Sequence, residues 1–116
     1  MTGIPSNMVT WFQIPADDPE RAWRFYGRVF GWSSEKAYAD RKRLGAINGD
    51  VAKREGFLQQ PCLAIRVDSV EATARAIRAA GGTILEEPSE IPGLGMVYAV
   101  FQDPEGNVLN VVGDAS

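Results

Sequence analysis

The sequence contains no histidine, and this absence limits the chemistry open to the chain. Histidine is the commonest metal ligand in proteins and the usual base of Ser-His-Asp and Cys-His catalytic sites. The chain also has a single cysteine, Cys62, so no disulfide can form within it and no oxidising compartment is implied. Catalytic sites built on an imidazole are therefore excluded.

Long apolar runs and a strong excess of charge are absent as well. The longest apolar stretch, residues 96–101, has the length of a strand, whereas a membrane span needs about 18 residues. The net charge of -3 disfavours nucleic acid as a partner, because nucleic-acid binding needs a basic face. The first seven residues lack the charged and apolar segments of a signal peptide. We therefore expect a cytoplasmic protein with no nucleic-acid or membrane partner.

The length and composition that remain are those of one globular domain. The chain has 116 residues, of which 45% are hydrophobic and 23% are charged. A chain of this mass buries about two-thirds of the surface that it exposes when unfolded. It can therefore form a core without disulfides, and we expect residues 1–116 to be a single domain.

A strand followed by a helix is predicted near the start of the chain. Residues 8–14 are rich in β-branched and aromatic types, which favour a strand. Asp18 before Pro19 is typical of a helix start, and Gly31 is typical of a helix end. Between them, apolar residues recur at helical spacing and form one face, namely Ala22, Phe25, Tyr26, Val29 and Phe30.

A second copy of this unit follows 51 residues later in the chain. Residues 62–67 predict a strand, Asp68 or Ser69 can cap a helix, and Gly81-Gly82 can end it. At this offset the identical residues fall at the strand centre, the cap, the first helical turn and the helix end, as Ile14/Ile65, Asp17/Asp68, Glu20/Glu71 and Gly31/Gly82. The spacing therefore predicts a structural repeat.

Further strands are predicted after each helix. Residues 96–102 and 108–112 alternate in polarity around a loop of turn residues, 103–107, which indicates a β-hairpin. In the first half, residues 32–37 favour a strand and residues 44–52 a short strand pair. Two modules follow, at about residues 8–58 and 61–113, each with one strand, one helix and then several strands.

Four segments resemble the glyoxalase/bleomycin-resistance/dioxygenase superfamily, also called vicinal oxygen chelate. They are IPADDPERAWRFYGRVFGW at residues 14–32, GAINGDVAKREG at 45–56, VDSVEATARAIRAAGGTI at 67–84 and DPEGNVLNVV at 103–112. The resemblance implies an α+β fold of two βαβββ modules that form a half-open barrel with the helices outside. A cup inside such a barrel holds a metal ion or a ligand.

The positions at which family enzymes hold their metal carry unusual residues here. The resemblance places them at Trp11, at Cys62, at Asn110 and in the strand of residues 44–52, where Asn48 and Asp50 are the alternatives. An indole has only an N–H donor, and a neutral amide is a weak ligand. A single thiolate without imidazole or carboxylate companions does not make a catalytic zinc or nickel site. We therefore expect no metal and no other cofactor.

Strand alternation separates two faces of the expected sheets. The residues expected to pack under the helices are Phe12, Ile14, Leu63, Ile65, Leu109 and Val111. The residues expected to contact a ligand in the cup are Trp11, Gln13, Cys62, Arg66, Tyr98 and Asn110, although alternation leaves the face of Tyr98 open. An apolar lining with an aromatic ring and a few polar groups is typical of a small-molecule pocket.

Several of these residues also have a purely structural interpretation. Trp11 either stacks on a ligand or fills the cup as core. Cys62 is either an inert buried thiol or a nucleophile, for which Arg66 or a lysine is the available activator. Asn110 is either a structural amide or a ligand contact, and Arg66 is either a solvated charge at a strand end or an anion anchor.

The sequence thus leads to a metal-free small-molecule-binding protein of the sequestration or resistance type. The alternative is a lyase or isomerase of the same superfamily, metal-independent or metal-dependent, with no catalytic residue identified, so the question of an enzyme stays open. A third possibility is a structural subunit with a closed cup. We also expect a homodimer, because half-open sheets leave strand edges and small members of this family usually pair.

Overall fold

The computed structural model describes residues 6–33 and 47–115. The chain divides into two compact units. We call residues 10–63 the first unit, and residues 1–9 with 64–116 the second unit. No helix in the described ranges is both long enough and apolar enough to cross a membrane.

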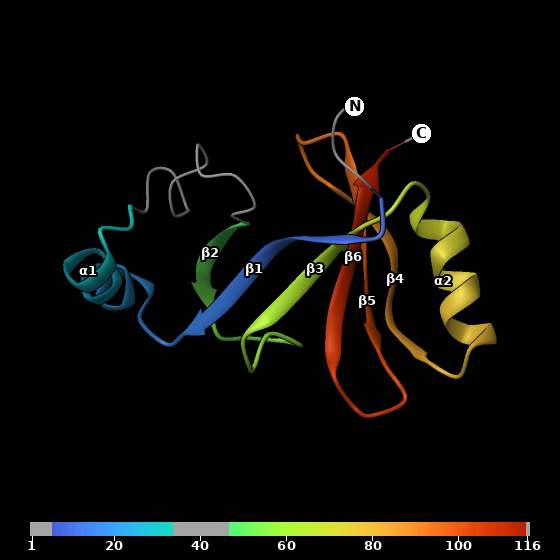
Figure 1. Cartoon of the computed structure of the whole chain (residues 1–116), viewed down its shortest axis with the longest axis horizontal. Coiled ribbons are helices and arrows are strands. Elements are labelled where there is room, and N and C mark those ends of the chain that lie inside the picture. The colour runs from blue at the N-terminus through green and yellow to red at the C-terminus, as the bar shows by residue number, and fades with distance from the viewer. Residues whose placement is uncertain (1–5, 34–46, 116) are drawn as a thin grey trace. The chain divides into compact units, whose positions relative to one another are not determined.

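The second unit holds a four-stranded sheet and one helix (Figure 1). In chain order its elements are β3 (Cys62–Arg66), α2 (Val70–Ala79), β4 (Thr83–Ile91), β5 (Met96–Gln102) and β6 (Val108–Asp114). The first two residues of β3 belong to the first unit. The strand order is β3-β6-β5-β4, in which β3 runs parallel to β6 and β5 runs antiparallel to both of its neighbours. This succession of strand, helix and three strands is the predicted βαβββ module.

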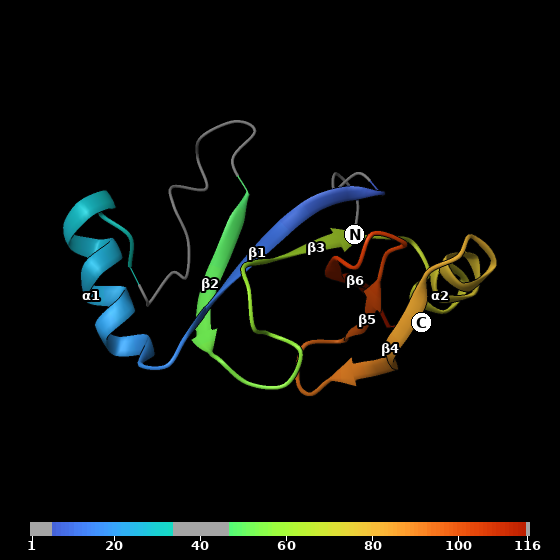
Figure 2. The same ribbon diagram turned by 90° about the horizontal axis from the view of Figure 1, so that it is seen from below.

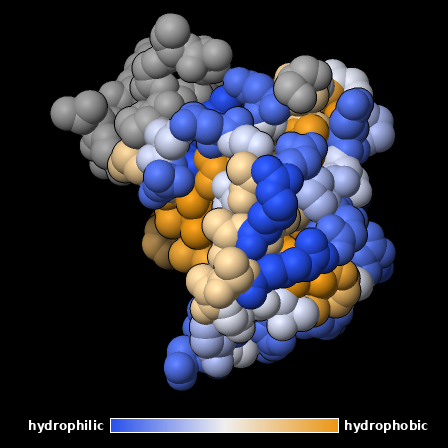
Figure 3. All heavy atoms as spheres, turned by 90° about the vertical axis from the view of Figure 1, so that its right-hand side faces the viewer, coloured by the Kyte–Doolittle hydropathy of each residue, from blue (hydrophilic) through white to orange (hydrophobic). Residues whose placement is uncertain are grey.

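Helix α2 packs on one face of this sheet (Figure 2). The buried residues of this layer are Val67, Val70, Val97, Ala99, Phe101 and Val111, with Ile65 and Leu109 packed against them. The outward positions of α2 are exposed and include Glu71, Arg75 and Arg78. On this side of the molecule, hydrophilic residues lie beside hydrophobic patches (Figure 3). The prediction that Ile65, Leu109 and Val111 lie under a helix is confirmed.

Leu63 is a correction to that prediction. Leu63 is 42% exposed and is not part of the buried layer under α2. The pairing of β3 with β6 begins only at Ala64, so Leu63 precedes the part of the sheet that α2 covers.

The predicted hairpin between β5 and β6 is confirmed, and Asp103 organises its loop. The carboxylate of Asp103 accepts hydrogen bonds from the backbone N–H groups of Glu105 and Asn107, both at 2.9 Å, and from the Asn107 side chain at 3.0 Å. Gly106 completes the turn with a φ of 90°, which side-chain-bearing residues rarely adopt.

The first unit contains β1 (Met8–Ala16), whose first two residues belong to the second unit, α1 (Pro19–Phe30) and β2 (Asn48–Lys53). The Asp18 carboxylate accepts from the backbone N–H of Arg21 at 3.2 Å and caps α1, which ends at Gly31 with a φ of 77°. Both predicted helix limits are confirmed. Most of the strand expected at residues 32–37, and residues 44–46 of the expected strand pair, lie outside the described residues.

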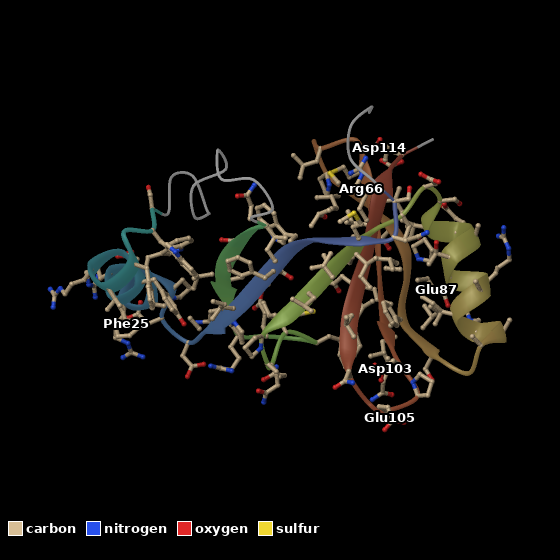
Figure 4. All side chains as sticks on the ribbon, in the orientation of Figure 1. Phe25, Arg66, Glu87, Asp103, Glu105 and Asp114 are labelled. Carbon is tan, nitrogen blue, oxygen red and sulfur yellow. The ribbon has the colours of Figure 1, made fainter. Side chains whose placement is uncertain are left out.

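Aromatic rings connect β1 to α1 within the first unit. The ring of Trp32 lies 5.7 Å from that of Phe12 and stacks on that of Tyr26 at 5.0 Å between centroids. Phe12 therefore faces the helix side, as predicted. No residue of α1 is fully buried, however, and Phe25 is 57% exposed (Figure 4). The apolar face of α1 is thus only partly covered.

Candidate functional site

The parallel pairing of β1 with β2 brings four side chains to one face. Trp11 pairs with Asn48, and Gln13 pairs with Asp50. Side chains alternate along a strand, so these four residues share the face opposite to Phe12 and Gly49. We call Trp11, Gln13, Asn48 and Asp50 the β1–β2 polar face. All four are partly buried.

One oxygen acceptor on the β1–β2 polar face has no partner among the described residues, and a second is partly desolvated. The side-chain oxygen Oδ1 of Asn48 is buried and has no hydrogen-bond partner among the residues that the structure describes. Burial raises the pKa of Asp50, and a hydrogen bond from the backbone N–H of Val51 opposes this rise in part. A ligand that donates hydrogen bonds to these oxygens therefore relieves a desolvation cost.

In the second unit, Arg66, Tyr98 and Asn110 share the face that points away from α2. Arg66 and Tyr98 both pair with Val112 of β6, one from each side. Asn110 lies two residues before Val112 and therefore points the same way. The register thus assigns Tyr98 to the face on which we predicted Arg66 and Asn110.

Two acidic residues that sequence reasoning missed hold Arg66 and Tyr98 in place. Nη2 of Arg66 lies 2.8 Å from a carboxylate oxygen of Asp114, and the Arg66 side chain is only 13% exposed (Figure 4). This hydrogen bond lowers the pKa of Asp114. The hydroxyl of Tyr98 donates to the carboxylate of Glu86, and this bond raises the pKa of Tyr98. The interpretation of Arg66 as a solvated charge is therefore wrong.

Cys62 is buried at the start of β3. Its Sγ lies 3.6 Å from the carbonyl oxygen of Leu63, within range of a weak hydrogen bond. Arg66, which was one possible activator of this thiol, forms an ion pair with Asp114. These contacts favour the interpretation of Cys62 as an inert thiol.

Comparison with known families identifies the class of protein. Residues 8–111 match the Glyoxalase/Bleomycin resistance protein/Dioxygenase superfamily. The match covers most of the chain, and the chain therefore belongs to this superfamily.

Two relatives of this chain show similarity over most of its sequence. A protein named as a glyoxylase, CFP32 of Mycobacterium tuberculosis, is 30% identical over 111 residues. The match covers 88% of this chain and 42% of CFP32, so the chain spans less than half of that relative. A lactoylglutathione lyase of Haemophilus influenzae is 35% identical over 117 residues, which cover 85% of this chain and 87% of that protein.

Solved structures confirm the α+β fold. A methylmalonyl-CoA epimerase of Streptomyces coelicolor, in complex with 2-nitronate-propionyl-CoA, superimposes with a TM-score of 0.69 at 15% identity, covering 97% of this chain and 100% of the epimerase chain. A hypothetical protein of Bacillus halodurans superimposes with a TM-score of 0.70 at 15% identity, covering 97% of each chain. At this identity the likeness concerns the fold alone.

The strand register bears on the one position for which the resemblance left Asn48 and Asp50 as alternatives. In the second unit Asn110 pairs with Ala64, and in the first unit Asp50 pairs with Gln13. Because Gln13 precedes Ala64 by the 51-residue repeat, Asp50 is the counterpart of Asn110. The register therefore selects Asp50 over Asn48, the two residues that the sequence left as alternatives.

Taken one by one, the residues that the resemblance implies at the family's metal positions are a poor set of ligands for a divalent metal ion. Trp11 offers no lone pair, Asn110 offers a neutral amide, and only Asp50 and Cys62 are ordinary metal ligands. Within residues 6–33 and 47–115, no group of three or more His, Cys, Asp or Glu side chains is placed to hold a metal ion. The donor set favours hydrogen bonding over coordination.

Proposed function

We propose that this protein binds a small molecule without the aid of a metal ion, as a sequestration or resistance protein does. The observation that carries the proposal is the donor set of Trp11, Asp50, Cys62 and Asn110, which has one carboxylate and no imidazole at the family's metal positions. Reactions that need a divalent ion to stabilise an enediolate or to bind dioxygen are disfavoured by this set.

The faces that point away from the helices support ligand binding. In the first unit Trp11 and Gln13 combine an aromatic surface with an amide, next to the acceptors described above. In the second unit Arg66, Tyr98 and Asn110 place polar groups at partly buried positions of one face. A small number of polar groups on an otherwise apolar surface is the usual composition of a ligand site.

Elemental analysis and native mass spectrometry of the purified full chain test this proposal. We expect no stoichiometric nickel, zinc, iron or manganese, and a mass equal to the polypeptide alone or with an organic ligand. A ligand at 100 times its Kd then stabilises the fold by about 2.7 kcal/mol, which a thermal-shift assay detects. Stoichiometric metal that is lost on Cys62→Ser and Asp50→Asn, but retained on Asp103→Asn, refutes the proposal.

A lyase or isomerase is the alternative, and Asp50 is the observation that favours it. Burial raises the pKa of Asp50, which makes this carboxylate a stronger base for proton transfer than an ordinary aspartate. The lactoylglutathione lyase among the relatives suggests a substrate to try. Incubation of S-lactoylglutathione with the protein in D2O, followed by NMR, reports deuterium at the hydroxyl-bearing carbon. Exchange that Asp50→Asn abolishes supports the enzyme, and no exchange above the protein-free rate rejects it for this substrate.

A further inference from the structure

The β1–β2 polar face is rich in acceptors of hydrogen bonds. Oδ1 of Asn48 is buried without a partner among the described residues, and the Asp50 carboxylate lies two residues further along the same strand. Neighbouring side chains on one face of a strand are close enough to contact the same small group. The group that satisfies both residues must donate at least two hydrogen bonds.

The negative charge of Asp50 favours a ligand group that is positively charged. The Asp50 carboxylate is partly buried, and a cation beside it offsets the cost of burying a charge more effectively than a neutral donor does. Hydrogen bonds between two charged partners are roughly twice as strong as neutral ones. A protonated amine supplies both the charge and the several N–H donors.

Trp11 adds an aromatic surface to the same face. It pairs with Asn48 in the parallel register and lies two residues from Gln13 on β1. An indole attracts organic cations through its ring electrons and also covers their hydrocarbon part. The four residues are partly buried rather than fully buried.

We propose that the β1–β2 polar face binds the primary ammonium group of a small organic cation, with Asn48 and Asp50 accepting its hydrogen bonds and Trp11 covering its hydrocarbon part. The inference rests on the proposed function and names its ligand class. A metal ion is a poorer occupant, because an indole and amides surround a single carboxylate.

A matched pair of probes tests the charge requirement. Phenethylammonium chloride and the neutral phenethyl alcohol are titrated separately into the 15N-labelled full chain. NMR follows the indole N–H of Trp11, assigned with Trp11→Phe, and the side-chain amide of Asn48. We expect saturable shifts of both signals with the ammonium probe, at an affinity at least about tenfold above that for the alcohol.

Substitutions test the named acceptors. Asp50→Asn should weaken phenethylammonium binding about tenfold or more, because it removes the charge but keeps the shape of the side chain. Asn48→Ala should weaken it to a smaller extent. Glu105→Gln, which makes the same change of charge in the loop between β5 and β6, should leave the affinity unchanged. Retained amide dispersion in the spectra shows that each variant is folded.

Three outcomes overturn the inference. Equal affinity for the alcohol and the ammonium probe removes the role of charge, and full affinity in Asp50→Asn removes the role of the carboxylate. The absence of a saturable shift with both phenethylammonium and the smaller ethylammonium removes the site. In each case the proposed function survives if other small molecules raise the melting temperature of the metal-free chain, whereas stoichiometric metal refutes that function separately.

Discussion

The ionised side chain of Asp50 lowers the stability of the free protein but favours the binding of a cationic ligand. The fold raises the pKa of Asp50, and desolvation is the largest cause. A buried group of this kind destabilises the free protein when it is ionised, and a cationic ligand removes the penalty. We therefore interpret Asp50 as a residue that serves binding rather than stability.

Replacement of Asp50 by asparagine should raise the stability of the free protein at pH 7. Since the folded pKa lies above the ordinary value of 3.8, the folded state holds the proton more tightly than the unfolded state. The wild type therefore loses stability as the pH rises from 3.8 through the folded pKa, while Asp50→Asn does not titrate at this position. As the pH rises from 3 to 7, the melting temperature of Asp50→Asn should increasingly exceed that of the wild type.

The control for this prediction is Glu105→Gln, whose carboxylate is exposed. It should follow the wild type across the same range of pH. A variant Asp50→Asn that melts below the wild type at pH 7 contradicts the prediction.

Gly49 is the second residue whose role depends on its neighbour across the sheet. A Cβ atom at this position would lie 2.3 Å from the ring of Phe12, its partner in the parallel register. Gly49→Ala should lower the free energy of unfolding by about 1–3 kcal/mol, as overpacking of a close contact does. Urea denaturation measures the loss. In a Phe12→Leu background the same substitution should cost less, and an equal cost in both backgrounds contradicts the proposed contact.

At the scale of elements, the two helices differ in how much of their apolar face is covered. Helix α2 buries Val70 and Ala74 against its sheet, whereas α1 has no fully buried residue and exposes Phe25 and Phe30. Their sequences predict both helices equally well, since caps and apolar spacing are present in each. How much of a helix face is covered depends on the elements that pack on it. The spacing of apolar residues along the helix does not reveal those elements.

The N-cap of α2 gives a prediction at this scale. The Ser69 hydroxyl accepts from the backbone N–H of Ala72 at 3.1 Å. Ser69→Ala should lower the free energy of unfolding by about 1 kcal/mol, because an N–H group of the first turn loses its partner. Ser69→Asp keeps an acceptor at the cap and should retain most of the stability. Equal chemical-denaturation midpoints for Ser69→Ala and the wild type contradict this role.

Strand β4 explains why Glu86 escaped sequence reasoning. Register shifts between Ile84 and Glu86, and again between Glu86 and Ser89, break the alternation on which an assignment of faces relies. Pro88 and the acidic residues of the strand also make it a poor edge for pairing with another chain. The same register shifts in β4 therefore explain why alternation along the strand could not predict that Glu86 is the partner of Tyr98.

At the scale of the whole molecule, we expect the chain to form a homodimer. Half-open sheets of this fold leave strand edges that a second copy can cover. Sedimentation of a concentration series should give a species of roughly twice the chain mass of 12.6 kDa. A sample that sediments as a 12.6 kDa species at every concentration contradicts the prediction.

The local elements, and the exclusion of imidazole chemistry, could be predicted from the sequence alone. The cap at Asp18, the helix end at Gly31 and the hairpin around Asp103 each depend on residues within a few positions, so their patterns were legible. The lack of histidine likewise needed no structure. Three pairings could be known only from the folded chain: Asp50 lies opposite Gln13, Glu86 accepts a hydrogen bond from the Tyr98 hydroxyl, and Asp114 forms an ion pair with Arg66. These partners are distant in the chain, and they meet because hydrophobic packing and strand irregularities, rather than local preference, set the register.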